Sequence, residues 1–379
     1  MRVLVVDTYY PAFLTEHYRR RPELAGRSFD EQRHALMERC FGTSDAYSWH
    51  FRERGHDSID VIANCEPLQL RWADERSRRR GALSRLGSAL PGRGGVVARR
   101  TLLRRIALDQ IAEFDPNVVY LQDLWFFRGD DLDRLRRAGR LVVGQIASRI
   151  PPERTLRRFD LLLTSFPHFV ERFRAQGVDS EYLKIAFDTR VVDHLRTNGI
   201  DVDPAAPREH DVVFVGGLDP NVHGRAIGLL ERAIEDTNLE VWGYGVDALP
   251  QASAIRARYH GEAWGLAMYE VLARSRIALN RHIDLAEGYA NNMRLYEATG
   301  VGALLMTEAS PNLADLFTPG TEVVAYEDED DLIEQIRHYL AHDDERRIVA
   351  AAGQARTLRE HTYADRVAEL ATMLEARLR

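Results

Sequence analysis

The chain is short of lysine, and this scarcity excludes one kind of chemistry and weakens the case for another. Lys184 is the only lysine among the 51 lysine and arginine residues of this 379-residue chain. A Walker A loop needs a lysine beside glycine and Ser or Thr, whereas Lys184 stands between Leu183 and Ile185. The sequence therefore excludes P-loop nucleotide hydrolysis. A Schiff-base mechanism would depend on Lys184 alone, so we do not expect one.

Cysteines and long apolar runs are also scarce. Cys40 and Cys65 have neither metal-ligand spacing nor the pattern of a disulfide framework, so we expect two reduced thiols that pack in the interior. No run of about 18 apolar residues appears, and the first apolar run, Val3 to Val6, is too short for a signal peptide. We therefore expect no membrane span and a cytoplasmic location.

Positive charge is not in excess, because the net charge is -7. This balance argues against a general nucleic-acid binder, whose affinity would rest on neutralising phosphates. What the chain does contain is ordinary for a globular protein, with 45% hydrophobic and 29% charged residues. At this length two domains are the default expectation.

Apolar runs of strand length alternate with helical patterns in both halves of the chain, which predicts an α/β fold with doubly wound sheets. We expect a first domain over 1–197, a polar, proline-bearing linker over 198–210, a second domain over 211–360 and an amphipathic helix over 361–379. The predicted strands are 3–6, 59–63, 118–121, 141–144, 161–164, 212–215, 239–242, 277–279 and 303–306. Further helices are predicted at about 45–54, 223–235, 265–274, 292–299 and 329–341.

The segment before the predicted helix 292–299 carries the clearest functional signal. Ligands bind at the carboxyl ends of the strands in such sheets, and this helix begins there. Asn291 or Asn292 can cap the helix, and the amides of Met293 and Arg294 would then form a site for a phosphate. Arg294 adds a cation, and Glu297 could reach a ribose. The alternative is an ordinary capped surface helix with a solvated Arg and Glu.

Two further loops of the second half supply candidates. Gly216 and Gly217 would let a ligand approach the backbone, and Arg225 is a candidate cation for a diphosphate or a solvated helix residue. Tyr259 and His260 follow a short predicted strand, where they would border a nucleobase or form a packed aromatic corner.

Here the sequence resembles a known family, the CgeB-like (spore-maturation-protein-like) glycosyltransferases. The resemblance is carried by the runs Arg276–His282 and Asn292–Leu305, and by the tail Leu316–Val324, Ala350–Gly353 and His361–Arg366. In the first half the similar runs are Phe41–Ser48, Gly55–His56 and Thr164–Phe169.

This resemblance implies a GT-B fold, with two Rossmann-like domains facing across a cleft and the last helix packing back on the first domain. It also implies transfer of a sugar from a nucleotide-diphosphate sugar to an acceptor in the N-terminal domain, without a metal or other cofactor. Asn280 and His282 then join the donor-binding candidates.

One departure from the wider group-one glycosyltransferases bears on the sugar. Glu297 matches the second Glu of their Glu-x7-Glu motif, but the first falls at Tyr289, and Glu287 is two residues out of register. This loss motivates an alternative, a non-catalytic GT-B scaffold that binds a nucleotide or a protein partner.

The remaining candidates lie in the first half. An inverting reaction would need a base, and Asp123, just past the strand 118–121, and His17 are candidates. Asp130, Asp131 and Asp133 imitate a metal-binding motif but open a helix, so we expect no metal site. The arginines of residues 71–105 form either a solvated loop or a surface that touches anionic lipid or a phosphorylated acceptor.

Overall fold

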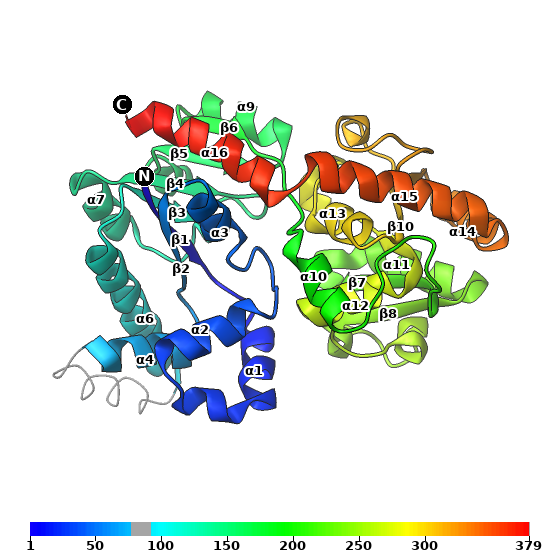
Figure 1. Cartoon of the computed structure of the whole chain (residues 1–379), viewed down its shortest axis with the longest axis horizontal. Helices are drawn as coiled ribbons and strands as arrows, with labels where there is room; N and C mark the ends of the chain where they lie inside the picture. The colour runs from blue at the N-terminus through cyan, green and yellow to red at the C-terminus, as the bar shows by residue number, and fades with distance from the viewer. Residues whose placement is uncertain (77–91, 379) are drawn as a thin grey trace. The chain divides into compact units, whose positions relative to one another are not determined.

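The computed structural model describes residues 1–76 and 92–378, and these divide into two compact units (Figure 1). The first unit comprises Met1–Leu183 and Val367–Arg379, and the second comprises Lys184–Arg366. Each unit is built on its own parallel sheet with helices around it. The α/β fold predicted from the alternating pattern is therefore confirmed.

The first unit's sheet has six strands among the described residues, in the order β2-β1-β3-β4-β5-β6. All neighbouring strands pair in parallel. The central strands are apolar because helices cover both faces, and every residue of β3 and β5 is buried. The strands are β1 (Arg2–Asp7), β2 (Asp57–Ile62), β3 (Val118–Leu121), β4 (Leu141–Gln145), β5 (Leu161–Thr164) and β6 (Ser180–Tyr182).

The first unit's helices include two in the polar and aromatic stretch that follows β1. One of them, α2, starts at a capping box in which Ser28 and Glu31 satisfy each other's backbone amides. The helices are α1 (Pro11–Arg20), α2 (Phe29–Met37), α3 (Ala46–Glu53), α4 (Glu66–Arg76), α6 (Gly92–Phe114), α7 (Gly129–Arg137), α8 (Glu153–Leu156) and α9 (Pro167–Ala175).

The second unit's sheet has five strands among the residues that the structure describes, in the order β11-β10-β9-β7-β8. They also pair in parallel throughout. The strands are β7 (His210–Gly217), β8 (Leu239–Tyr244), β9 (Ser275–Asn280), β10 (Leu304–Glu308) and β11 (Val324–Tyr326). The helices are α10 (Arg190–Thr197), α11 (Pro220–Asp236), α12 (Leu266–Ala273), α13 (Met293–Gly300), α14 (Glu329–Ala341) and α15 (Asp343–Glu360).

The boundary between the compact units differs from the predicted linker. Residues 198–210 lie inside the second unit, as does α10, which packs against α12. Val202 is buried, and the Arg208 guanidinium donates to the carbonyl oxygen of Gly302 at 3.1 Å. These contacts hold residues 198–210 in the second unit, although their polar, proline-bearing composition is typical of a linker.

The predicted C-terminal helix forms as α16 (Tyr363–Leu378), and its last part belongs to the first unit, as expected. Leu370 and Leu374 are fully buried, and Arg377 pairs with Asp179 at 2.8 Å and Glu181 at 3.2 Å. The chain therefore begins and ends in the same unit.

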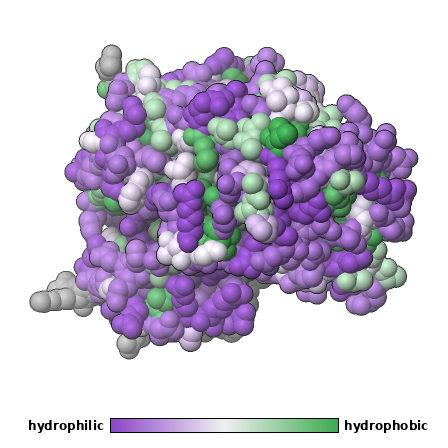
Figure 2. Space-filling model, turned by 45° about the vertical axis from the view of Figure 1, so that its right-hand side comes forward, coloured by the Kyte–Doolittle hydropathy of each residue, from purple (hydrophilic) through white to green (hydrophobic). Residues whose placement is uncertain are grey.

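The face in Figure 2 is mostly hydrophilic, with apolar residues in small separate spots. Within residues 1–76 and 92–378, no helix has both the length and the apolar character needed to cross a membrane.

Candidate functional site

Each sheet has a point where the strand order reverses, and in such sheets a crevice for ligands opens there at the carboxyl ends. In the first unit this point lies between β1 and β3, and in the second between β7 and β9. These two edges are therefore where the fold offers a ligand site.

Glycines lie near the carboxyl ends of β7 and β8, beside the second unit's reversal point. Gly216 and Gly217 end this strand, and Gly243 lies beside Gly216 on β8. A Cβ atom on Gly243 would overlap the Gly216 carbonyl oxygen, so no other residue fits there without moving β8 from β7. The two backbones come this close only because Gly243 has no side chain.

The start of α13 differs in detail from the predicted cap. Asn292 occupies the N-cap position, but its side chain accepts no hydrogen bond from the helix. Instead, its Nδ2 donates to Asn280 Oδ1 at 2.8 Å and to the Arg281 carbonyl at 3.1 Å. The first amides of α13, including those of Met293 and Arg294, therefore lack a side-chain cap. Such amides attract an anion.

Asn280 and His282 join this helix start to the ends of β9 and β10. Asn280 Nδ2 donates to Thr307 Oγ1 at 2.9 Å, and His282 Nε2 lies 3.2 Å from the same oxygen. Burial, together with the neighbouring Arg281, lowers the pKa of His282 to about 4, so its imidazole is neutral. Within the part of the chain that the structure describes, the buried Asn292 Oδ1 has no hydrogen-bond partner.

Arg294 and Glu297 pair with each other rather than facing solvent. The guanidinium lies 2.8 Å from Glu297 Oε2 and donates to the Val215 carbonyl at 3.0 Å. Tyr269 Oη donates to Glu297 Oε1 at 3.4 Å. Glu297 is only 6% exposed. Burial raises the pKa of Glu297, and the Arg294 charge opposes this shift. The carboxylate is therefore held rigidly within a turn of the helix start.

The other second-unit candidates, Arg225, Tyr259 and His260, lie on α11 and beside β8 rather than on α13. Arg225 is exposed on α11. Tyr259 forms a β-bridge with Val241 of β8, and its hydroxyl donates to the Gly243 carbonyl at 2.8 Å. His260 stacks on Trp242 and pairs with Glu240 at 3.0 Å, so its ring is part of a packed corner on β8. His260 and Trp242 thus form a packed aromatic corner, and a contact of Tyr259 or His260 with a nucleobase stays a prediction.

In the first unit, two carboxylates meet at the reversal point. Thr8 donates from its amide to Asp7 Oδ1 at 2.7 Å and from its hydroxyl to Asp123 Oδ2 at 2.8 Å. Trp125 donates from its amide to Asp123 Oδ1 at 2.8 Å. Burial raises the pKa of Asp7 to about 7, and the charge of Asp123 adds to this shift. Asp7 was not among the predicted site residues, although an acid that ends an apolar strand is a recognisable signal.

His17 lies in a different environment. Its ring is fully buried on α1 beside Phe13 and Tyr18, and within the described residues neither ring nitrogen has a hydrogen-bond partner. Burial, with Arg39 nearby, lowers the pKa of His17 to about 4. The structure therefore does not bring His17 together with the Asp7 and Asp123 pair.

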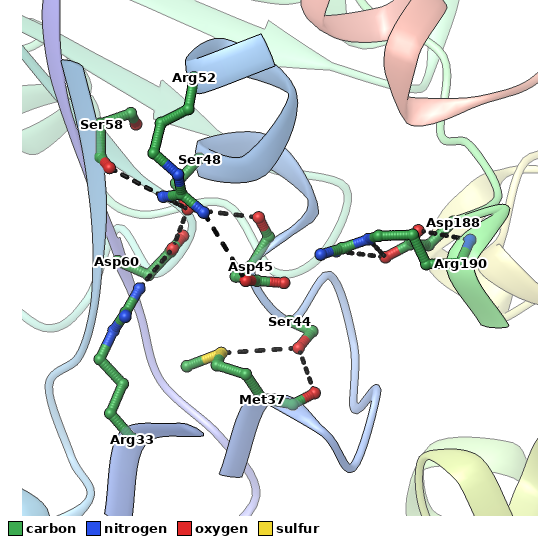
Figure 3. A network of polar contacts seen from close by, with 10 residues as sticks. All are labelled: Arg33, Met37, Ser44, Asp45, Ser48, Arg52, Ser58, Asp60, Asp188 and Arg190. Atoms are coloured by element: carbon green, nitrogen blue, oxygen red, sulfur yellow. Dashed lines mark hydrogen bonds and ion pairs between the residues drawn. The ribbon is translucent and has the colours of Figure 1, made fainter. Parts of the chain in front are cut away.

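A third acid, Asp60 on β2, ties two helices to the sheet (Figure 3). Its carboxylate accepts a hydrogen bond from Ser48 of α3 and lies 3.4 Å from Arg33 of α2. Arg52 donates to Ser48 Oγ at 3.0 Å and to the Ser58 carbonyl at 2.9 Å. Burial raises the pKa of Asp60 to about 6. This network fixes α2 and α3 beside the reversal point.

The acids that imitate a metal motif are used in ion pairs. Asp131 caps α7 and lies 3.1 Å from Arg104, and Asp133 pairs with Arg158. In the described ranges, no group of three or more His, Cys, Asp or Glu side chains could hold a metal ion.

Residues 225–372 match a family model described as glycosyl transferase-like. The matched segment begins on α11 and includes β9, α13 and β10, so Asn280, Asn292 and the Arg294–Glu297 pair all lie within it. No curated protein matches the chain by sequence.

Solved structures extend the likeness to both units. Sucrose-phosphate synthase from Thermosynechococcus elongatus gives a TM-score of 0.57 at 10% identity, with 99% of each chain covered. Anabaena Alr3699/HepE in complex with UDP-glucose gives 0.59 at 11% identity, covering 99% of this chain and 100% of that one. A protein described as a UDP-N-acetylglucosamine 2-epimerase from Listeria monocytogenes gives 0.51 at 12%, covering 100% and 96%.

At such low identities the likeness concerns the fold alone. The matched segment is thus part of a GT-B fold with two Rossmann-like units, as predicted. The epimerase shares this fold, so the fold by itself does not decide the reaction.

Proposed function

We propose that this protein is a glycosyltransferase that moves a sugar from a nucleotide-diphosphate sugar to a hydroxyl acceptor. The observation that carries the proposal is the match of residues 225–372 to a glycosyl transferase-like model, combined with the site at the start of α13. That HepE was solved with UDP-glucose supports a nucleotide-sugar donor. The CgeB-like subfamily, the identity of the sugar and activity without a metal are parts of this proposal.

The donor would lie over the carboxyl ends of β7 and β9. The amides of Met293 and Arg294 offer hydrogen bonds to the diphosphate, and the glycines at 216 and 217 let it approach the backbone. Arg225, exposed on α11, is the candidate cation for the diphosphate. Glu297 is the candidate for the ribose hydroxyls, because a buried carboxylate is a strong acceptor at a fixed position.

The chemical step breaks the bond between the anomeric carbon and the diphosphate oxygen. Negative charge grows on that oxygen, and the helix amides and Arg225 would stabilise it as it develops. Such stabilisation needs no metal ion. The bond that forms joins the anomeric carbon to the acceptor oxygen.

An inverting reaction also needs a group that takes the acceptor proton. Asp123, with Asp7 beside it, is our candidate, because the pair lies at the first unit's reversal point and Thr8 bridges it. His17 is less suited, because its ring is fully buried. A retaining reaction would need no such base.

The decisive test is Glu297→Gln, with binding of UDP-, GDP-, ADP- and dTDP-sugars measured by calorimetry. The amide keeps the size of the side chain but loses the charge. We expect the affinity for the bound nucleotide sugar to fall about tenfold to a hundredfold, that is by about 1.5–3 kcal/mol. Glu297→Ala is a poorer choice, because it would leave the Arg294 guanidinium buried without its partner.

Asp211→Asn is a matched control. Asp211 is also an acid that pairs with an arginine, since Arg276 lies 2.9 Å from it, but it stands at the amino end of β7, opposite the end that carries Gly216. The affinity of this variant for the nucleotide sugar should stay at the wild-type value. Wild-type affinity in the Glu297→Gln protein would remove Glu297 from the site.

A second candidate function is a non-catalytic GT-B scaffold, and it is favoured by Tyr289 in place of the first Glu of the motif. Glu287, two residues away, lies exposed in a left-handed backbone conformation. Measuring hydrolysis and transfer with the sugar that binds separates the two functions, because a scaffold would bind without turnover.

A further inference from the structure

Three large apolar side chains lie exposed on two elements of the first unit. Val96 is 67% and Val97 is 59% exposed on the first turns of α6, and Trp125 is 44% exposed in the segment after β3. Arg100 connects the two elements, since its guanidinium donates to the Trp125 carbonyl at 2.7 Å. Val96 and Val97 precede Arg100 by four and three positions, so they lie one turn before it on the same side of the helix. The segment that carries Trp125 therefore contacts α6 one turn from the two valines.

This group lies at the carboxyl edge of the sheet. Helix α6 precedes β3, so it runs from the carboxyl edge to the amino edge. Arg99 lies 3.5 Å from Glu66, which begins α4 directly after the end of β2. A helix of this length spans about 34 Å, far more than the short strand β3, so its first turns reach past the edge. Asp123 ends its strand at the same edge.

Arginines surround the apolar side chains. The Arg149 guanidinium lies 5.8 Å from the Trp125 ring, and Trp125 Nε1 donates to the Arg149 carbonyl at 3.2 Å. Arg99 keeps 45% of its side chain exposed beside Glu66. In a chain of net charge -7, the sequence from Arg93 to Arg105 has five arginines and no acid. The first half of α6 is therefore rich in positive charge, while the arginines at 78, 79, 80 and 85 of the predicted basic stretch lie outside the described residues.

We propose that Val96, Val97 and Trp125, together with Arg99, Arg100 and Arg149, form a surface that docks on an anionic lipid membrane. Exposed valines and a tryptophan enter the interface between headgroups and acyl chains, and arginines attract the anionic headgroups. Because the three arginines are positively charged, we expect the surface to bind an anionic bilayer more tightly than a neutral one. This α6 docking surface would hold the edge that carries Asp7 and Asp123 near the headgroups, and it is independent of the identity of the sugar donor.

The test is sedimentation of the full chain with vesicles of phosphatidylcholine alone and of an equal mixture of phosphatidylcholine and phosphatidylglycerol. We expect binding to the mixed vesicles that is at least about tenfold tighter than to the neutral ones and that weakens with added salt. The double variant Val96→Asp/Val97→Asp should bind the mixed vesicles at least about tenfold more weakly, because it removes apolar contact and adds negative charge.

Ile348→Asp is the matched control. Ile348 is 68% exposed on α15 in the second unit, so the same substitution there should leave vesicle binding unchanged. Trp125→Ala tests the surface without adding charge and should also weaken binding. The melting temperature of each variant reports whether it is folded, and all substituted positions are exposed.

Three outcomes would overturn the proposal. One is a wild-type chain that stays in the supernatant with both vesicle types. Another is equal binding to neutral and anionic vesicles. The third is a folded Val96→Asp/Val97→Asp protein that sediments as the Ile348→Asp protein does.

Discussion

The Asp7 carboxyl is a single group whose ionisation should make stability depend on pH. Its pKa is about 7 in the folded chain against an ordinary 3.8, chiefly because of burial. Between these values the folded state binds more protons than the unfolded state, so the stabilising contribution is complete below about pH 4 and is lost as pH rises through 7. Asp7→Asn removes this dependence. As pH rises from 5 to 8, we expect the variant to gain about 2–3 kcal/mol in unfolding free energy relative to wild type, since each pH unit between the two pKa values contributes about 1.4 kcal/mol.

Urea unfolding at both pH values measures this gain. Asp57→Asn is the control, since Asp57 is an exposed acid that begins β2 at the opposite edge of the sheet. The assignment of a raised pKa to Asp7 fails if the two variants depend on pH alike. Asp123 could be predicted from the sequence, because it follows an apolar strand. The Asp7–Thr8–Asp123 arrangement could not, because strands β1 and β3 become neighbours only in the sheet.

At the scale of elements, Gly243 allows β8 to lie close to β7 beside the candidate donor site. A side chain at Gly243 would overlap the Gly216 carbonyl, so Gly243→Ala must push β8 away from β7. We expect this variant to lose about 2–4 kcal/mol of stability and to bind nucleotide sugar more weakly. Gly228→Ala is the control, because nothing lies within 4 Å of a Cβ there and α11 should gain about 0.5–1 kcal/mol. Thermal unfolding of both proteins checks the contrast, and equal stabilities would contradict it.

The elements that the sequence predicted well are those whose burial is continuous. Strands 118–121 and 161–164 are buried at every position and were predicted with their observed ends. Strands β6 and β11 were not predicted, because each has only three residues at the edge of its sheet, and β6 also lacks an apolar run. Helix α15 was also not predicted, because its apolar side chains are few and Arg346, fully buried among them, interrupts the pattern. The pairing of Arg294 with Val215 depends on residues far apart in sequence, so no local pattern could indicate it.

At the scale of the whole molecule, the end of the chain stabilises the unit in which the chain begins. Leu374 on α16 is fully buried in the first unit, although every strand of the second unit precedes it in sequence. We therefore expect Leu374→Ala to destabilise the first unit by about 2–5 kcal/mol. Hydrogen exchange followed by mass spectrometry should show faster exchange in peptides from β1, β3 and β5, while those from β7 and β9 keep their protection.

Leu378→Ala, one turn further along the same helix, is the matched control for this prediction. Leu378 is 39% exposed, so its truncation should change the exchange of neither unit by more than about 0.5 kcal/mol. Loss of protection in β7 and β9 of the Leu374→Ala protein would mean that the two units unfold as one. Protection lost in the first unit alone would mean that α16 couples the end of the chain to its first sheet without making the second sheet depend on it.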